Sequence, residues 1–192
     1  MLVLGISGSL RRDSYNRRLL AAAAELLPPA VEFVRWSGLA PIPPYNADID
    51  VASAPATVDE LRAALARADA LLIATPEYNH SIPGQLKNAL DWASRPFPDN
   101  ALRAKPVAVF GASTSLFGAV WAQAEVRKVL SASGAGVIDE ELAVASAHEA
   151  FAADGSLADP TLRAGLVGIL EQLLQATPQP SEQGRVTAPT RA

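Results

Sequence analysis

Three short runs of this sequence are almost continuously apolar, and they constrain the fold more than any other feature. They cover residues 2–7 (LVLGIS), 71–75 (LLIAT) and 107–111 (VAVFG). A strand with one face in water alternates apolar and polar residues, whereas a strand covered on both faces does not need to. The three runs therefore predict the central strands of a parallel sheet that carries helices on both faces.

Two further segments are weaker strand candidates. Residues 31–36 (VEFVRW) alternate more, as an edge strand does. Residues 137–144 give a fifth candidate, which the acidic residues Asp139, Glu140 and Glu141 interrupt.

Helical patterns fill the gaps between these runs. Thr57 and Glu60 have capping-box spacing, which predicts that a helix starts there. Pro83 can open another helix, and Asp159 before Pro160 is a typical cap and first-turn pair. The apolar stripes at helical spacing cover residues 19–27, 61–68, 86–90, 122–130 and 162–173.

Strands that alternate with helices imply right-handed crossovers and an α/β fold of three layers. Five strands suit the flavodoxin-like sandwich, a five-stranded parallel sheet in the order 2-1-3-4-5 with a cofactor at the carboxyl ends of the strands. We assign residues 1–176 to one such domain and expect residues 177–192, rich in Pro, Gln, Ser and Thr, to be a disordered tail. The long loop over residues 37–55 is a candidate substrate cover.

Composition argues against several chemistries and partners. The chain has no Cys and two His, so we expect no disulfide, no thiolate catalysis and no metal site. The net charge of −4 and the pI of about 5.2 argue against nucleic acid and anionic membranes, because both call for a basic face. No segment approaches the ~20 apolar residues of a membrane span, and the start lacks a basic leader, so we expect a cytoplasmic protein.

The loop after the first apolar run reads SGSLRRDSYN, precedes a helix and has the chemistry of an anion site. A helix N-terminus presents free backbone N–H groups and a partial positive charge. Hydroxyl, amide and guanidinium donors suit a phosphate group. The side chains that supply them are Ser7, Ser9, Ser14, Asn16 and either Arg11 or Arg12.

The alternative for this loop is an ordinary solvated turn in which Asp13 or Ser14 caps the helix. The pattern is neither GxGxxG nor GxxxxGK[ST], so it favours neither a dinucleotide site nor a nucleoside triphosphatase.

The loop after the LLIAT run reads PEYNHSIPG and is stiffened by proline. Pro76 fixes its own φ, and Glu77, Tyr78 and Asn79 then offer backbone N–H groups in succession. Such a loop can donate to the edge of a heteroaromatic ring with Tyr78 beside it; the alternative is a simple connection with Tyr78 packed as a lid. We expect His80 to be a surface or packing residue, and Glu77 suits an interface ion pair as well as a site.

The loop after the VAVFG run places small hydroxyl residues, including Ser113, at a third wall of the expected pocket. A rival interpretation is a nucleophile elbow of GxSxG type at Ser113, with Asp139 and His148 completing a hydrolase triad. Ser115 in place of the last glycine, and the crowding of all three residues into one short segment, disfavour the hydrolase.

Taken together, the three loops resemble the NADPH-dependent FMN reductase family of flavodoxin-like proteins, which includes chromate, quinone and azo-dye reductases. The resemblance rests on SGSLRRDSYNRRL, TPEYNHSIPGQLKNALDW and GASTSLFG, and it extends over roughly residues 1–130. It implies that the FMN phosphate is held by Ser9, Arg11, Ser14 and Asn16, with Tyr15 nearby. It also implies that the isoalloxazine ring runs along Pro76, Glu77, Tyr78 and Asn79, and that Ser113 closes the ribityl or ring side.

The resemblance implies an enzyme that binds FMN non-covalently and passes a hydride from NADPH or NADH to a quinone, flavin, azo compound or chromate by ping-pong turnover. The flavin supplies the chemistry, so no residue is assigned as a catalytic acid or base. Relatives of this kind are homodimers or homotetramers, and Trp121 stands where they often carry an Arg, which puts the tetramer in question. The alternatives are a flavodoxin-type electron carrier and a non-enzymatic flavin-binding protein.

Overall fold

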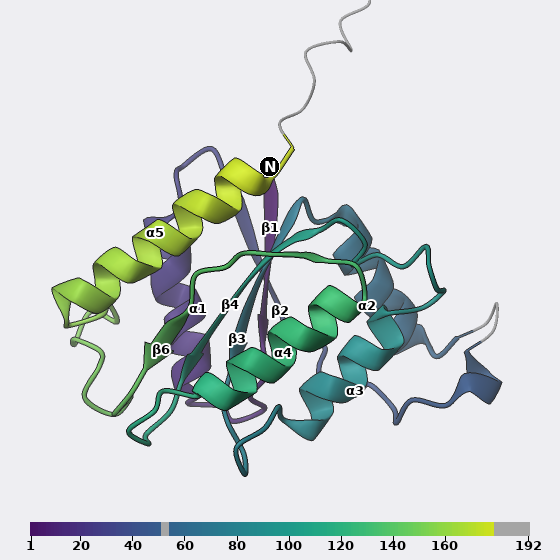
Figure 1. Cartoon of the computed structure of the whole chain (residues 1–192), viewed down its shortest axis with the longest axis horizontal. Coiled ribbons are helices and arrows are strands. Elements are labelled where there is room, and N and C mark those ends of the chain that lie inside the picture. The colour runs from purple at the N-terminus through teal and green to yellow at the C-terminus, as the bar shows by residue number, and fades with distance from the viewer. Residues whose placement is uncertain (51–53, 179–192) are drawn as a thin grey trace, which may run out of the picture.

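The computed structural model describes residues 1–50 and 54–178, with a parallel sheet at its centre (Figure 1). The strands run in the order β2-β1-β3-β4-β5, and β6 pairs with the end of β4. This topology confirms the α/β flavodoxin-like fold and the predicted order 2-1-3-4-5. The strand bounds are β1 Leu2–Ser7, β2 Glu32–Trp36, β3 Ala70–Thr75, β4 Pro106–Ala112, β5 Gly136–Val137 and β6 Leu142–Val144.

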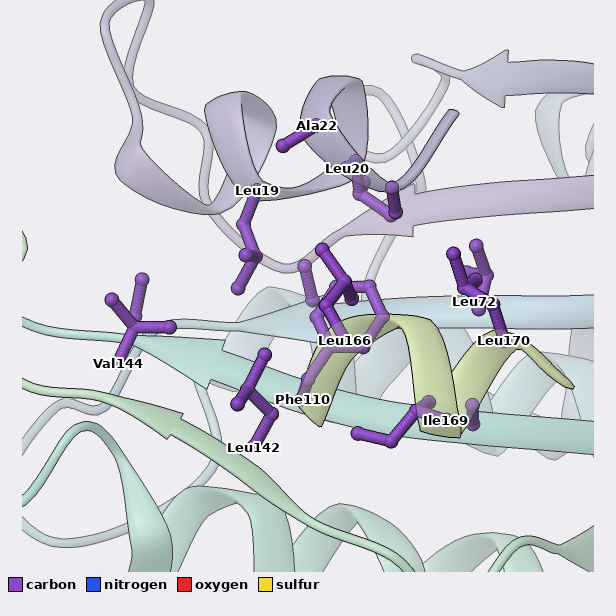
Figure 2. Close-up of a cluster of buried hydrophobic side chains, with 14 of the residues drawn as sticks. Leu19, Leu20, Ala22, Leu72, Phe110, Leu142, Val144, Leu166, Ile169 and Leu170 are labelled. Carbon is purple, nitrogen blue, oxygen red and sulfur yellow. The ribbon is translucent and has the colours of Figure 1, made fainter. Parts of the chain in front are cut away.

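Helices cover both faces of the sheet and give three layers. The helix bounds are α1 Tyr15–Leu26, α2 Ala56–Arg67, α3 Gly84–Ala93, α4 Val120–Ala132 and α5 Pro160–Ala176, with a short 3₁₀ helix at Ala47–Ile49. The helices α1 and α5 pack on one face, and α2, α3 and α4 pack on the other (Figure 1). Figure 2 shows Leu19 of α1 and Leu166 of α5 beside Phe110 of β4. Because β3 and β4 are buried on both faces, their sequences do not alternate.

The predicted fifth strand is divided into β5 and β6. The Ile138 N–H still donates to the Val107 carbonyl oxygen at 2.9 Å, and residues 139–141 then leave the ladder. Arg127 of α4 fills this gap. Its guanidinium donates to the carbonyl oxygens of Ile138 at 2.6 Å, Asp139 at 3.0 Å and Glu140 at 3.3 Å. One half-buried guanidinium therefore binds carbonyl groups that no neighbouring strand reaches.

Two helix starts follow the sequence signals. Ser14 caps α1, with its hydroxyl accepting the Asn16 N–H at 3.2 Å. Asp159 caps α5, with its carboxylate accepting the Thr161 N–H at 2.7 Å. Pro83 is the residue immediately before α3.

The predicted capping box at Thr57 and Glu60 is wrong. The helix α2 already begins at Ala56, and Pro55, which has no side-chain acceptor, occupies the cap position. Thr57 therefore lies inside the first turn, and its hydroxyl donates to the carbonyl oxygen of Pro41 at 3.5 Å instead.

The described part of the long loop after β2 is tied down to α3. Leu39 and Ile42 are buried in the core beneath it. Gln85 donates to the carbonyl oxygens of Leu39 at 2.8 Å and Ile42 at 2.9 Å, and the Trp92 indole donates to that of Pro43 at 2.8 Å. These bonds attach residues 39–43 of the loop to α3.

The chain after α5 begins with a buried residue. The Thr177 hydroxyl donates to the Leu173 carbonyl oxygen at 2.7 Å, and its N–H donates to that of Leu174 at 3.3 Å. Residues 179–192 of the expected tail lie outside the described residues. Within residues 1–50 and 54–178, no helix has both the length and the hydropathy to span a membrane.

Candidate cofactor site

Three loops meet at the carboxyl ends of β1, β3 and β4. The strand register pairs Ser7 with Ala74 and Thr75 with Gly111, so the three strands end at one level. The loops enclose a hollow of about 130 Å³. Nine of the ten residues expected to hold the cofactor line it, namely Ser9, Arg11, Ser14, Tyr15, Asn16, Pro76, Glu77, Tyr78 and Ser113. Asn79, the tenth, is not among the lining residues.

The first loop supplies two buried hydroxyl groups. Ser9 and Ser14 are each 4% exposed. Ser14 accepts an N–H as the helix cap, but its hydroxyl keeps a hydrogen to donate, and the same holds for Ser9. Arg11 is exposed and lines the same hollow. Ser14 therefore caps α1, as the solvated-turn interpretation expects, and it also lines the hollow with Ser9 and Arg11, whose donors suit a phosphate.

Gly8 lets the first two loops lie against each other. A Cβ at this position would come within 2.8 Å of Leu86 Cδ2 and 3.2 Å of Pro76 Cδ. Packing between the first and second loops therefore requires a residue without a side chain at position 8.

Asn16 joins the first loop to the third. The residue is 2% exposed, its Oδ1 accepts the Ala112 N–H at 3.0 Å, and its Nδ2 donates to the Ala112 carbonyl oxygen at 2.9 Å. The side-chain amide is thus bound at both ends by the protein, and its contribution to the hollow is to position the loops.

Tyr15 is held at the rim by a contact that the sequence did not reveal. Its ring stacks on Phe151 with a centroid separation of 6.2 Å and an interplanar angle of 11°. The Arg18 guanidinium lies 5.9 Å from the Tyr15 centroid and 5.8 Å from the Phe151 centroid. Phe151 follows β6, far from Tyr15 in the chain, and no local motif marks it.

The second loop contains a tight turn. The N–H of Tyr78 donates to the Ser81 carbonyl oxygen at 3.2 Å, and the Ser81 N–H returns the same bond at 3.2 Å. Between them Asn79 has a φ of 53° and His80 a φ of 57°, the left-handed pair that a type I′ turn requires. Because the Tyr78 N–H is hydrogen-bonded within the turn, the backbone donors left in this segment for a ligand are those of Glu77 and Asn79.

Glu77 caps the fourth helix. Its Oε2 accepts the N–H groups of Trp121 at 3.0 Å and Ala122 at 3.1 Å, and its side chain is 7% exposed. Ala119, the residue at the cap position itself, has a left-handed φ of 67° and no side-chain acceptor. The carboxylate therefore binds the positive end of α4 across 44 positions of sequence, a pairing that no local motif signals.

The third loop is held by the segment that follows β5. The Ser113 N–H donates to the Val144 carbonyl oxygen at 3.0 Å, and the Ser113 carbonyl oxygen accepts the Ala147 N–H at 3.0 Å. The Ser113 hydroxyl lies 3.0 Å from that of Ser115. β6 thus sets the position of this wall of the hollow.

The loops that build the hollow carry a known sequence pattern. The pattern of the NADPH-dependent FMN reductase family matches residues 1–149 of the 192. The chain belongs to this family. Membership confirms the resemblance that the three loop motifs suggested.

Individual FMN reductase relatives are similar over most of the chain. An NAD(P)H-dependent FMN reductase of Pseudomonas aeruginosa PAO1 is 43% identical over 175 residues, 91% of this chain and 91% of that protein. A quinone reductase of Escherichia coli K12 is 39% identical over 129 residues, 67% of this chain and 68% of that protein. The solved structure of FerB, a flavoenzyme NAD(P)H:(acceptor) oxidoreductase from Paracoccus denitrificans, has a TM-score of 0.81 at 38% identity, covering 91% of this chain and 95% of that one.

In this FMN reductase family member the alternative hydrolase triad is not assembled. Asp139 lies 3.9 Å from the Arg127 guanidinium, and His148 Nε2 lies 3.4 Å from a Glu149 carboxylate oxygen. No hydrogen bond or ion pair links either of them to Ser113, and all three are described residues. Among residues 1–50 and 54–178, no group of three or more His, Asp or Glu side chains is arranged to bind a metal ion.

An aromatic patch lies next to the hollow. Trp121 is 39% exposed, and its ring meets His80 edge-on at 4.6 Å and Phe117 at 5.0 Å between centroids. Tyr78 is 50% exposed and Leu116 is 81% exposed. We call these five residues the aromatic patch. His80 thus lies at the surface and packs on Trp121, as the sequence favoured.

Proposed function

We propose that this FMN reductase family member binds FMN non-covalently across its three loops and passes electrons from NADPH or NADH to a small-molecule acceptor. The observation that carries the proposal is that nine residues from three separate loops line one hollow at the carboxyl ends of the strands. When bound, FMN supplies the hydride chemistry, taking two electrons from the nicotinamide and returning them to the acceptor. We assign residues 1–176 to the domain that does this.

The phosphate end of the cofactor would be held by the first loop. Ser9, Ser14 and Arg11 line the hollow at this end, where the backbone N–H of Tyr15 begins α1. A helix of 12 residues adds a partial positive charge at this end. Donors of three kinds around one small hollow fit a dianionic phosphate. Asn16 would contribute by holding this loop in place, because its amide is already bound to Ala112.

The ring end of the cofactor would run along residues 76–79. The hollow of about 130 Å³ is smaller than the roughly 300–1,000 Å³ of pockets that enclose a drug-sized ligand. FMN would therefore be enclosed at its phosphate and would lay its ring along the open second loop, with Tyr78 beside it. One open ring face would serve the nicotinamide and the acceptor in turn, which gives ping-pong turnover.

The chain's own side chains would orient the reactants rather than transfer protons. Glu77 is the one carboxylate among the residues that line the hollow, and it is bound to the start of α4. The backbone N–H groups of Glu77 and Asn79 would stabilise negative charge on the ring. We assign no catalytic acid or base.

We propose a quinone-type acceptor and a homodimeric or homotetrameric assembly. The acceptor class is supported by the quinone reductase of Escherichia coli among the similar proteins. The assembly is supported by the aromatic patch, which a second copy would cover together with the open ring end. Light scattering on the FMN-loaded protein tests the assembly, and a monomer would contradict it.

The decisive experiment is an anaerobic titration. The purified chain is loaded with FMN, its absorbance is followed during addition of NADPH or NADH, and a panel of quinone, azo, flavin and chromate acceptors is then added. We expect stoichiometric FMN binding, bleaching by a nicotinamide and repeated turnover with a quinone. A protein that does not take up FMN overturns the proposal. Binding without reduction by either nicotinamide would instead identify an electron carrier or a non-enzymatic flavin protein.

A further inference from the structure

Tyr15 is contacted by Phe151, a residue of the connection between β6 and α5 (Figure 1). The family pattern covers residues 1–149, so Phe151 comes just after the segment that it matches. The pattern therefore includes the three loops of the hollow but not this contact.

Tyr15 is the first residue of α1 and lines the cofactor hollow beside Ser14. The first turn of a helix is its least firmly held part, because its N–H groups lack helical partners. Ser14 accepts the Asn16 N–H, whereas the Tyr15 N–H has no acceptor within residues 1–50 and 54–178. That N–H is therefore available to an anion, and the position of Tyr15 matters for the phosphate of FMN.

Two side chains that do not line the hollow hold the Tyr15 ring. Phe151 lies nearly parallel to it, 6.2 Å away between centroids, which is the offset-stacked arrangement that aromatic pairs prefer. Arg18, one turn further along α1, has its guanidinium within 6 Å of both ring centroids. In the described part of the chain the Tyr15 hydroxyl makes no hydrogen bond to protein, so the contacts of its ring orient this side chain.

Phe151 is itself fixed by a short hairpin over residues 151–157. It forms an antiparallel bridge with Leu157, and the Ala152 N–H donates to the Ser156 carbonyl oxygen at 2.9 Å. Gly155 turns the hairpin with a φ of 88°, which favours glycine. Leu157 is 5% exposed and belongs to the core cluster shared with α1 and α5. The Phe151 ring is thus attached to the core and can restrain the less firmly held first turn of α1.

The same connection also binds the third loop. The Ala147 N–H donates to the Ser113 carbonyl oxygen at 3.0 Å, and the Ser146 N–H donates to that of Ser115 at 3.1 Å. One segment therefore holds the third loop by backbone hydrogen bonds and the start of α1 by an aromatic stack.

We propose that Phe151 is a positioning residue for the FMN phosphate and that it acts through Tyr15. Its ring restrains Tyr15 and so keeps the first turn of α1 in the geometry that presents the Tyr15 N–H to the phosphate. This inference rests on the proposed FMN site. Riboflavin has no phosphate, so its binding does not depend on the stack.

The test compares FMN with riboflavin by fluorescence titration of the purified full chain. F151L keeps an apolar side chain but removes the stacked ring. We expect it to raise the FMN dissociation constant about threefold to tenfold and to leave riboflavin binding unchanged. F151Y keeps the ring and should bind FMN as the wild type does. F33L is the matched control, because Phe33 is a partly buried residue of β2 that packs against the same core cluster, and it should leave both affinities unchanged.

A double-mutant cycle tests whether Phe151 acts through Tyr15. In a Y15L background, F151L should cause no further loss of FMN affinity, because the ring on which Phe151 acts is absent. Equal losses in both backgrounds, equal losses of FMN and riboflavin, or an unchanged FMN dissociation constant in F151L each overturn the inference. F151I replaces F151L if the latter does not fold.

The wild-type titration separates this inference from the proposed function. If the wild-type chain binds neither flavin, the proposed function fails and the inference fails with it. If the wild type binds FMN and F151L binds it equally well, the inference alone is wrong.

Discussion

Asn16 and Ala112, which are 96 positions apart, are joined by two hydrogen bonds through one side-chain amide. The amide of Asn16 takes the place of a strand neighbour for both backbone groups of Ala112, at the point where β4 ends. Because both residues are buried, neither group can turn to water instead. This pair therefore fixes the first loop against the third, and with them the two walls of the cofactor hollow.

The two hydrogen bonds between Asn16 and Ala112 form a clamp between the loops, and their removal should lower both the stability of the protein and its affinity for FMN. N16A leaves the N–H and the carbonyl of Ala112 without their partner, and each buried group so exposed costs about 1–3 kcal/mol. We expect the free energy of unfolding in urea to fall by about 2 kcal/mol or more, and the FMN dissociation constant to rise. N46A is the matched control, since Asn46 makes one exposed turn bond to Asp48. Equal stability of N16A and N46A would contradict the role of the clamp.

Arg11 should discriminate FMN from riboflavin. A hydrogen bond to a charged group contributes about 1.5–3 kcal/mol, and exposure of Arg11 reduces this. We expect R11Q to raise the FMN dissociation constant about tenfold and to leave riboflavin binding unchanged, because riboflavin has no phosphate. R12Q, a change at the adjacent residue outside the hollow, is the control. Fluorescence titration with both flavins measures the effect, and a parallel loss of riboflavin affinity would assign Arg11 to another part of the cofactor.

The sequence predicted the central strands because burial on both faces of a sheet requires a continuous run of apolar residues. In β3 and β4 every residue is buried, so the apolar runs coincide with the strands almost residue for residue. The loops were predictable for a related reason. Parallel neighbours end at one level, so residues that follow different strands, such as Ser9 and Ser113, are brought together by topology.

No local sequence pattern signals the interactions that hold these loops in place. Glu77 was open to interpretation as an ion-pair residue because the first N–H group that it accepts lies 44 positions later, in α4. The division of the fifth strand depends on Arg127, which reaches across from another element. The capping box predicted at Thr57 was wrong although its spacing is a local pattern, because the helix already begins at Ala56. Side-chain bonds to distant backbone groups are set by tertiary structure, and spacing along the chain does not encode them.

Glu77 should act as a helix cap that a neutral acceptor can partly replace. E77A removes the acceptor for two N–H groups of α4 and should lower the free energy of unfolding by about 1 kcal/mol, in the range found for caps. E77Q keeps a carbonyl oxygen for those N–H groups and loses only the favourable charge at the helix end, so it should fall between E77A and wild type. Chemical denaturation of the FMN-free protein measures this series. E125A, on a partly exposed position of the same helix, is the control, and E77Q no better than E77A would argue against capping.

Arg127 should position the third loop through β6. Its guanidinium holds residues 138–141, β6 follows directly, and the Val144 carbonyl oxygen accepts the Ser113 N–H at 3.0 Å. R127M keeps much of the aliphatic length but removes the donor for the Ile138 carbonyl oxygen, which is part-buried, and for two exposed carbonyl oxygens. We expect a loss of about 1 kcal/mol in unfolding free energy and weaker FMN binding. K128M changes the exposed neighbouring residue and should do neither. Hydrogen exchange should locate the change, with faster exchange of the Ser113 N–H in R127M alone. If R127M is destabilised but the Ser113 N–H exchanges at the wild-type rate, Arg127 does not position the third loop. Its effect is then limited to the edge of the sheet.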